Sequence, residues 1–274
     1  KVWAVPPADA PGGAEPTSAE PLLAVKCRAV VFTVKISRDK RVLATGDVTG
    51  RASLWDMGSG ELLAELECGS QVRSIDLSGD VCGGLKYHPG VRAGLIATGT
   101  GAGEAQVWDV AARHKRRSMA CGGMVYSVDL SGDATLLATG DQHKQALLWD
   151  TATGSLLMRL VCGDVVKRVD LSADDRLLAV GAGSACEIWD VPSGTRVITW
   201  PEAGGRVKLA SCGGKVACVN MTGQATLRRV LEPNVVTFWL PMIKDADALA
   251  AAVECIPSHA LLMHAVTPSG RNLL

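Results

Sequence analysis

The feature that most constrains this chain is a set of short sequence patterns that recur in a fixed order. The first pattern reads SIDLSGD, SVDLSGD and RVDLSAD, with a weaker copy TVKISRD; the copies begin at Ser74, Ser127, Arg168 and Thr33. The second pattern reads VLATGD, LIATGT, LLATGD and LLAVGA, and it follows each copy of the first. Successive copies of the first pattern lie 41, 53 and 41 residues apart. Such self-similarity is typical of repeat architectures.

Each repeat consists of four short segments that are rich in β-forming residues and separated by Gly or Asp turns. This arrangement predicts a four-stranded antiparallel meander. One meander has too small an apolar face to be stable alone, and units of ~40–45 residues with four strands stack radially as propeller blades. We therefore expect an all-β fold.

The third pattern identifies a family. It reads SLWDM, QVWDV, LLWDT and EIWDV, with the pairs Trp55-Asp56, Trp108-Asp109, Trp149-Asp150 and Trp189-Asp190. The chain here resembles the WD-repeat family, which implies an incomplete β-propeller with about five to six blades over residues 1–240. Trp3 joins the series in an opening half-blade, and a weaker last copy that lacks the Trp begins at Arg206. The five tryptophans are expected to be structural, and the chain to be a fragment of a longer protein.

The chain departs from the family at the entrance to each first strand. Family blades usually carry Gly-His there, whereas this chain reads Cys68-Gly69-Ser70, Cys121-Gly122-Gly123 and Cys162-Gly163-Asp164. The His that would join a buried hydrogen-bond network with Trp and Asp is missing, so we expect the blades to rely more on packing. Rings in this family often have seven blades, so closure is expected to need further sequence.

One variable position near the start of each first strand is the candidate binding site. Its residues are Phe32, Arg73, Tyr126, Lys167 and Arg206. The resemblance implies that the first strand is innermost and that this position lies near one mouth of a central channel. A ring of basic and aromatic side chains suits an acidic or phosphorylated peptide. The alternative is a set of solvated strand starts with arbitrary residues.

Two loop insertions offer a second candidate for a partner surface. One spans Pro6 to Pro21, and the other spans Val81 to Gly94 between the first and second strands of its blade. Long loops on one face can mark a partner site, but loop lengthening is also tolerated neutrally. Both readings stay open.

Patterns of catalysis or metal binding are absent from the sequence. Cys27, Cys68, Cys121 and Cys162 occur once per blade, so we expect small buried residues at blade junctions and no metal site. Asp76, Asp129 and Asp170 also fall on different blades, and the five histidines form no ligand spacing. The glycine-rich run from Gly99 to Gly103 is expected to be a hairpin turn. No cofactor is expected.

Residues 241–274 do not continue the β-strand repeats. Asp245-Ala246-Asp247 precedes an apolar run that predicts a helix ending at Pro257. The last residues, from Pro268, resemble the opening of an ankyrin repeat; the alternative is a connector helix that packs on the propeller.

Charge and composition limit the partners. Lys plus Arg and Asp plus Glu each number 28, so no global charge favours nucleic acid, and no apolar run is long enough to span a bilayer. The cysteine pattern favours reduced thiols and a cytoplasmic location. We expect a non-catalytic scaffold that binds proteins or peptides; the alternatives are a propeller enzyme with a central-channel site and a spacer or regulatory domain of a larger protein.

Overall fold

The computed structural model describes residues 23–78 and 94–201 and the backbone of three further strands at 206–209, 215–219 and 225–229. Within these ranges every regular element is a β-strand. The predictions for Trp3, for the insertion from Pro6 to Pro21, for residues 81–93 and for a helix in residues 241–274 fall outside the described residues.

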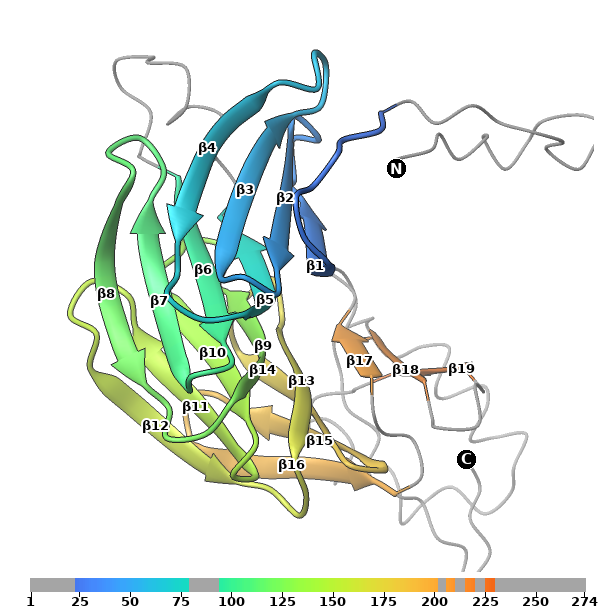
Figure 1. Ribbon diagram of the computed structural model, residues 1–274. Helices are drawn as coiled ribbons and strands as arrows, with labels where there is room; N and C mark the ends of the chain where they lie inside the picture. The colour runs from blue at the N-terminus through green and yellow to red at the C-terminus, as the bar shows by residue number, and fades with distance from the viewer. Residues whose placement is uncertain (1–22, 79–93, 202–205, 210–214, 220–224, 230–274) are drawn as a thin grey trace, which may run out of the picture. The chain divides into compact units, whose positions relative to one another are not determined.

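The chain divides into two compact units, Lys1–Val166 and Lys167–Leu274. In the first unit lie three antiparallel sheets of four strands each (Figure 1). The first sheet contains β1 (Val31–Ile36), β2 (Val42–Asp47), β3 (Arg51–Asp56) and β4 (Leu62–Glu67). The second contains β5 (Val72–Leu77), β6 (Leu95–Thr100), β7 (Glu104–Asp109) and β8 (His114–Ala120). The third contains β9 (Val125–Leu130), β10 (Leu136–Asp141), β11 (Gln145–Asp150) and β12 (Leu156–Val161).

The second unit repeats the same plan. A fourth four-stranded sheet contains β13 (Val166–Leu171), β14 (Leu177–Ala182), β15 (Ala185–Asp190) and β16 (Thr195–Trp200). A three-stranded sheet contains β17 (Arg206–Leu209), β18 (Lys215–Val219) and β19 (Ala225–Arg229). The predicted weak last copy is therefore confirmed as strands.

The sequence patterns map onto strands as predicted. The first pattern forms the first strand, the ATGD-like pattern the second, and each Trp-Asp pair ends the third. The predicted insertion lies between β5 and β6, where Ser78 N donates to Leu95 O at 2.9 Å and Ser78 Oγ accepts from Leu95 N at 2.8 Å. The hairpin is thus closed on either side of residues 79–93. The predicted hairpin turn between β6 and β7 consists of residues 101–103, whereas Gly99 and Thr100 end β6.

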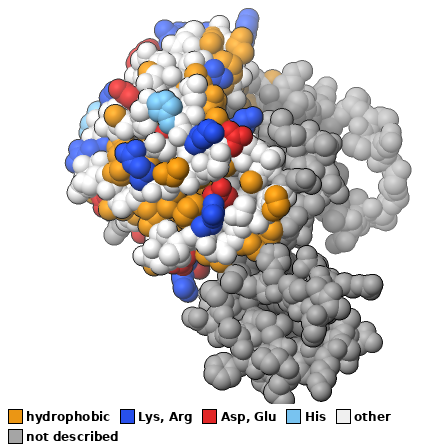
Figure 2. Space-filling view, turned by 90° about the horizontal axis from the view of Figure 1, so that it is seen from below, with side chains coloured by type: hydrophobic (Ala, Val, Ile, Leu, Met, Phe, Trp, Pro, Cys, Tyr) orange, Lys and Arg blue, Asp and Glu red, His pale blue; other side chains and the backbone are white. Residues whose placement is uncertain are grey.

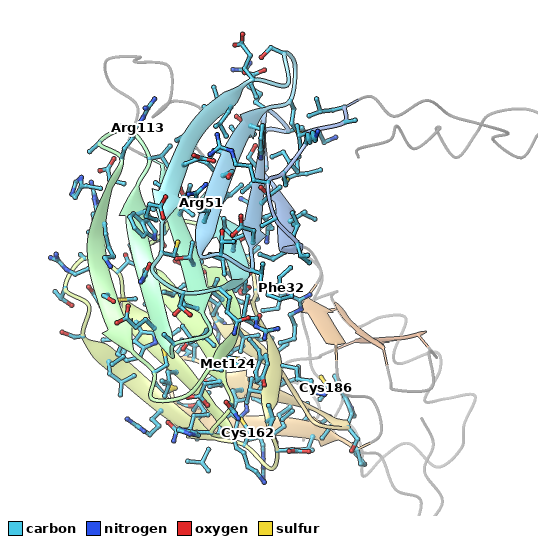
Figure 3. All side chains as sticks on the ribbon, in the orientation of Figure 1. Phe32, Arg51, Arg113, Met124, Cys162 and Cys186 are labelled. Carbon is cyan, nitrogen blue, oxygen red and sulfur yellow. The ribbon has the colours of Figure 1, made fainter. Side chains whose placement is uncertain are left out.

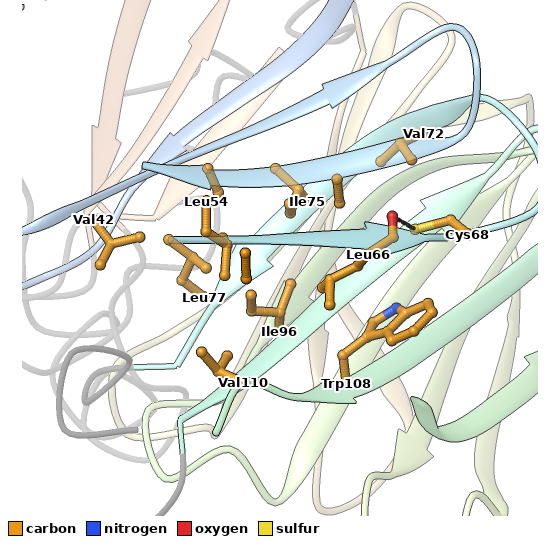
Figure 4. Close-up of a cluster of buried hydrophobic side chains, with 13 residues drawn as sticks. Val42, Leu54, Leu66, Cys68, Val72, Ile75, Leu77, Ile96, Trp108 and Val110 are labelled. Carbon is orange, nitrogen blue, oxygen red and sulfur yellow. Dashed lines mark hydrogen bonds between the residues drawn. The ribbon is translucent and has the colours of Figure 1, made fainter. Parts of the chain in front are cut away.

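Successive sheets of the first unit pack face to face. One buried cluster joins Leu54 and Leu66 of the first sheet to Ile75, Ile96 and Trp108 of the second (Figure 4). A second cluster joins the second sheet to the third in the same way. The three first strands, β1, β5 and β9, are neighbours in space. The apolar side chains of each sheet are therefore covered by the next sheet.

A glycine on each second strand sets how close the sheets come. A β-carbon on Gly46 would lie 2.5 Å from Val72 Cγ1, one on Gly99 would lie 2.7 Å from Val125 Cγ1, and one on Gly140 would lie 2.4 Å from Val166 Cγ1. Each of these valines begins the next first strand. The glycine therefore recurs because the valine of the next sheet leaves no room for a side chain. It lies within a strand and not in a turn.

A buried hydrogen-bond network surrounds the tryptophans although the His is missing. Each indole Nε1 donates to a threonine Oγ1 of the second strand at 3.1 Å, in the pairs Trp55–Thr45, Trp108–Thr98 and Trp149–Thr139. Cysteine thiols contact the same hydroxyls, at 4.0 Å for Cys27–Thr45, 3.7 Å for Cys68–Thr98 and 3.8 Å for Cys121–Thr139. The cysteine stands where blades of the family usually carry His. Its S–H group is a weak donor that contacts the same threonine hydroxyl as the indole.

In the fourth sheet the tryptophan indole donates its hydrogen bond to a different group. Val180 stands where the other sheets have threonine, so no hydroxyl is present. Trp189 Nε1 donates instead to Glu187 Oε2 at 3.1 Å, and Arg196 lies 3.8 Å from that carboxylate. The indole donor is satisfied in all four sheets, as expected for a buried polar group.

We predict that Gly99→Ala destabilises the domain, because the new methyl group would overlap Val125 and the sheets would have to separate. The expected loss is ~1–3 kcal/mol in the free energy of unfolding, measured by urea denaturation. Gly163→Ala is the matched control, since a β-carbon there meets no atom within 4 Å. Equal losses for both variants would contradict the close-approach explanation.

We predict that Thr98→Val lowers the free energy of unfolding by ~1–3 kcal/mol, because the Trp108 indole and the Cys68 thiol lose their shared hydroxyl. Thr199→Val, an exposed threonine on β16, should change stability by ~0.5 kcal/mol or less. Thermal and urea unfolding measure both. A Thr98→Val protein as stable as the parent would show that the polar network contributes nothing.

Candidate binding surface at the first strands

Four of the five predicted binding residues occupy matching places. Phe32, Arg73, Tyr126 and Lys167 are each the second residue of their first strand, on β1, β5, β9 and β13. Arg206 is the first residue of β17, and its side chain lies outside the described residues. The strand positions of the first four are therefore equivalent in the backbone.

Phe32 and Arg73 are brought into contact by the packing of β1 beside β5. The Arg73 guanidinium carbon lies 4.5 Å from the centroid of the Phe32 ring, a cation–π geometry. Phe32 remains 42% exposed. The Arg73 Nε is buried and donates no hydrogen bond. Figure 3 labels Phe32 beside the ribbon of the first strands. This pair holds a positive charge in a fixed orientation beside an exposed ring.

Tyr126 is half-buried on β9, the neighbouring first strand in the same unit. Lys167 is exposed on β13 of the second unit. The structure therefore brings Phe32 and Arg73 into contact with each other and places Tyr126 on the adjacent strand.

Polar side chains fix these strands in register. Ser74 Oγ accepts a hydrogen bond from Val128 N at 3.1 Å, and Asp76 Oδ2 accepts one from Leu130 N at 2.7 Å. Lys35 Nζ lies 2.5 Å from Asp76 Oδ1. The serine and aspartate of the first pattern therefore join β5 to β9, and Lys35 on β1 is joined to the same carboxylate. From the sequence, the aspartates of the first pattern were expected to lie apart on different blades. The sequence did not reveal that they form hydrogen bonds between sheets.

The aspartate of each Trp-Asp pair accepts hydrogen bonds from the turn that follows it. Asp56 Oδ1 accepts from Gly58 N and Ser59 N, and Asp150 Oδ1 from Thr153 N, all at 2.7–2.9 Å. These hydrogen bonds lower the pKa of Asp150 below its ordinary value. The carboxylates stabilise the third hairpin and leave no cluster for acid–base chemistry.

The cysteines are placed as small residues at sheet junctions, as predicted. Cys68, Cys121 and Cys162 are buried, and Cys27 is partly buried. Burial raises the pKa of Cys68 and of Cys121 to about 11, so both thiols keep their proton and are weak nucleophiles. Among the described residues no group of three His, Cys, Asp or Glu side chains could hold a metal ion.

Asp141 is an unusual carboxyl group at the end of β10. Its Oδ1 accepts from His143 N at 2.9 Å and Gln145 N at 3.0 Å, while its Oδ2 is buried without a hydrogen-bond partner. Burial raises the pKa of Asp141, whereas hydrogen bonds from Thr49 and Arg51 lower the pKa of the equivalent Asp47 against the opposing effect of burial. Asp141 has no exposed surface, so it cannot reach a ligand from solvent.

One charged feature was missed by the sequence reasoning. Residues 113–117 read Arg-His-Lys-Arg-Arg and lie on or next to β8, the outermost strand of the second sheet. The run is visible in the sequence, but only the sheet order shows that it forms an edge.

The described part of the chain contains no helix of the length and hydropathy that a bilayer-spanning segment requires.

Comparison with known proteins bears on the repeats directly. Residues 113–150 match the family described as "WD domain, G-beta repeat". This stretch covers β8, the outer strand of one sheet, and β9 to β11 of the next. No curated protein matches the chain. Together with the four antiparallel four-stranded sheets, the match establishes that this chain carries a WD40 repeat domain made of propeller-like blades.

Proposed function

We propose that this WD40 domain is a non-catalytic interaction scaffold that captures an acidic or phosphorylated peptide with the first-strand position. The observation that carries the proposal is Arg73, whose guanidinium is stacked on the partly exposed Phe32 ring. A guanidinium forms forked hydrogen bonds with carboxylate or phosphate oxygens. A peptide acidic group would pair with the terminal amino groups of this guanidinium.

The neighbouring positions suit the same ligand. The half-exposed Phe32 ring and the partly exposed Tyr126 offer flat contact area at little cost in side-chain entropy. Lys167 on β13 and Arg206 at the start of β17 carry basic character on the first strands of the second unit. Within the first unit the ligand would be recognised by Phe32, Arg73 and Tyr126, with Arg73 as the anchor.

The scaffold proposal is favoured over a propeller enzyme by the placement of ionisable groups. His114 begins β8, and His143 lies in the turn between β10 and β11, on different sheets. Asp76 is used between sheets, and Asp150 within a turn. An enzyme requires acid, base and orienting groups that converge on one reacting atom, and the described residues present no such set.

We also propose a reducing, cytoplasmic setting. Cys68 and Cys121 each contact a threonine of the buried network through the thiol. A disulfide or an oxidised sulfur would remove that donor and add volume to a packed junction.

We predict that the double substitution Arg73→Glu/Lys167→Glu weakens binding of a fluorescent phosphoserine peptide flanked by glutamates about tenfold or more, which corresponds to ~1.4 kcal/mol. The reversal of charge replaces attraction by repulsion at the anchor. Fluorescence anisotropy with the full chain at fixed ionic strength measures the affinity.

The matched control is Arg38→Glu/Lys40→Glu, which makes the same change in net charge at an exposed turn of the first sheet. It should change the affinity less than twofold, and thermal unfolding should show that both variants are folded. Unchanged binding by the Arg73 and Lys167 variant, or equal weakening by the control, would refute this binding site.

A further inference from the structure

The outer edge of the second sheet has a charge unlike that of its neighbours. β8 ends the order β5-β6-β7-β8, and residues 113–117 are all exposed. The corresponding edge strand of the first sheet, β4, carries the acidic residues Glu65 and Glu67, and that of the third, β12, has Arg159 as its one charged residue. A basic edge is therefore a property of this sheet and not of the repeat.

Three of the four Lys and Arg side chains in this run form no ion pair with a described carboxylate. Arg113 donates to the backbone carbonyl of Leu63 at 3.1 Å, and Arg117 donates to that of Ala152 at 2.9 Å. Lys115 lies 5.6 Å from the Trp108 ring centroid. Only Arg116 forms an ion pair with a described carboxylate, that of Asp109 at 2.5 Å. Carbonyls and rings are uncharged, so these contacts orient three cations without neutralising them, although Lys115 and Arg117 also lower the pKa of Glu104 and of Asp150 by their charge.

These cations lie on both sides of the edge. Arg113 reaches a carbonyl of β4 in the first sheet, and Lys115 is paired with Trp108, which packs in the cluster shared with that sheet. Arg117 reaches the turn before β12 of the third sheet. Figure 3 labels Arg113 at the end of β8. An extended chain directs its side chains alternately to two sides, so it can meet both sets.

Exposed apolar side chains adjoin the basic edge. On β12, Leu156, Leu157 and Val161 are 38%, 53% and 70% exposed. Arg117 passes within 3.2 Å of where a β-carbon on Gly154 would lie, in the turn that leads into this strand. Figure 2 shows hydrophobic and basic side chains next to one another on the face seen there. The combined surface, β8 residues 113–117 with the exposed side chains of β12, is called the β8 edge surface below.

The backbone at Arg113 gives a further observation. The third hairpins of the other three four-stranded sheets have glycine at this place, with φ of 76° at Gly60, 77° at Gly154 and 66° at Gly194. Arg113 adopts φ of 53°, a left-handed conformation that L-residues other than glycine rarely take. A charged side chain occupies a position where local structure favours glycine.

We propose that the β8 edge surface binds an extended acidic segment of a partner protein, with apolar residues between its carboxylates. The carboxylates would contact Arg113, Lys115 and Arg117, and the apolar residues would cover the exposed side chains of β12. A nucleic acid fits less well, because the cations are split between two sides of a narrow edge and the adjacent β4 carries glutamates. This surface is built from the opposite edge of the sheet from Arg73 and does not depend on the function proposed above.

The test uses the full chain and a fluorescent peptide of about ten residues in which Glu and Val alternate, long enough to span β8 at ~3.3 Å per residue. Arg113→Gly/Arg117→Gln removes two of the unneutralised charges and gives the hairpin the glycine found in the other sheets. The expected result is a five- to tenfold increase in Kd, measured by anisotropy, with unchanged thermal stability.

The control Lys40→Gly/Arg38→Gln removes two charges and also replaces a residue of positive φ, 58° at Lys40, by glycine. It should leave Kd within twofold. All the proteins compared carry Arg73→Glu, so that the first-strand site does not contribute to the measured affinity. The proposal is overturned if the Arg73→Glu parent does not bind the peptide or if the control weakens binding as much. It is also overturned if a single-stranded oligonucleotide or anionic vesicles bind more tightly than the peptide and lose affinity in the Arg113 and Arg117 variant.

Discussion

Successive sheets in the first unit can stack only because a glycine on each second strand admits the valine that begins the next first strand. At Gly46 and Gly99 any side chain would overlap that valine. The contact brings the Trp–Thr pair of one sheet within reach of the thiol that ends the sheet before it, as in Cys68 and Thr98. Close packing of this kind leaves little freedom for relative movement. The buried network and the register of the first strands both follow from this approach.

A rigid interior lets other positions vary. The second residue of each first strand is Phe, Arg, Tyr or Lys in the four-stranded sheets, while its neighbours along the strand remain Val, Ile, Ser or Asp for packing and for bonding between sheets in most copies. The same holds at the outer edges, where β4 is acidic, β8 basic and β12 largely apolar on equivalent frames. A repeat of this kind supplies a fixed scaffold on which surface chemistry differs from blade to blade, as suits a domain that binds other proteins.

The threonine–cysteine–tryptophan network shows where reasoning from the sequence reached its limit. The repeated Cys, the Thr of ATGD and the Trp of the Trp-Asp pair were all visible as separate columns. Their contact joins residues some ten to thirty positions apart, such as Cys68 with Thr98 and Thr98 with Trp108, across a sheet boundary. The absence of His suggested blades that rely more on packing, because the sequence does not say that a thiol can reach the same hydroxyl. The link from Asp76 to Leu130 N escaped prediction for the same reason.

The sequence by itself determined the strands, their antiparallel order within each sheet, the place of the insertion after Ser78 and the equivalence of Phe32, Arg73, Tyr126 and Lys167. These features depend on local β-propensity, turn chemistry and repetition, which are determined by residues close together in the sequence. Only the tertiary structure decided that Arg73 lies on Phe32, that Ser74 and Asp76 join neighbouring sheets, and that the basic run of β8 forms an exposed edge. These contacts depend on the distance between sheets, and that distance is set by packing across the interface and not by any one segment.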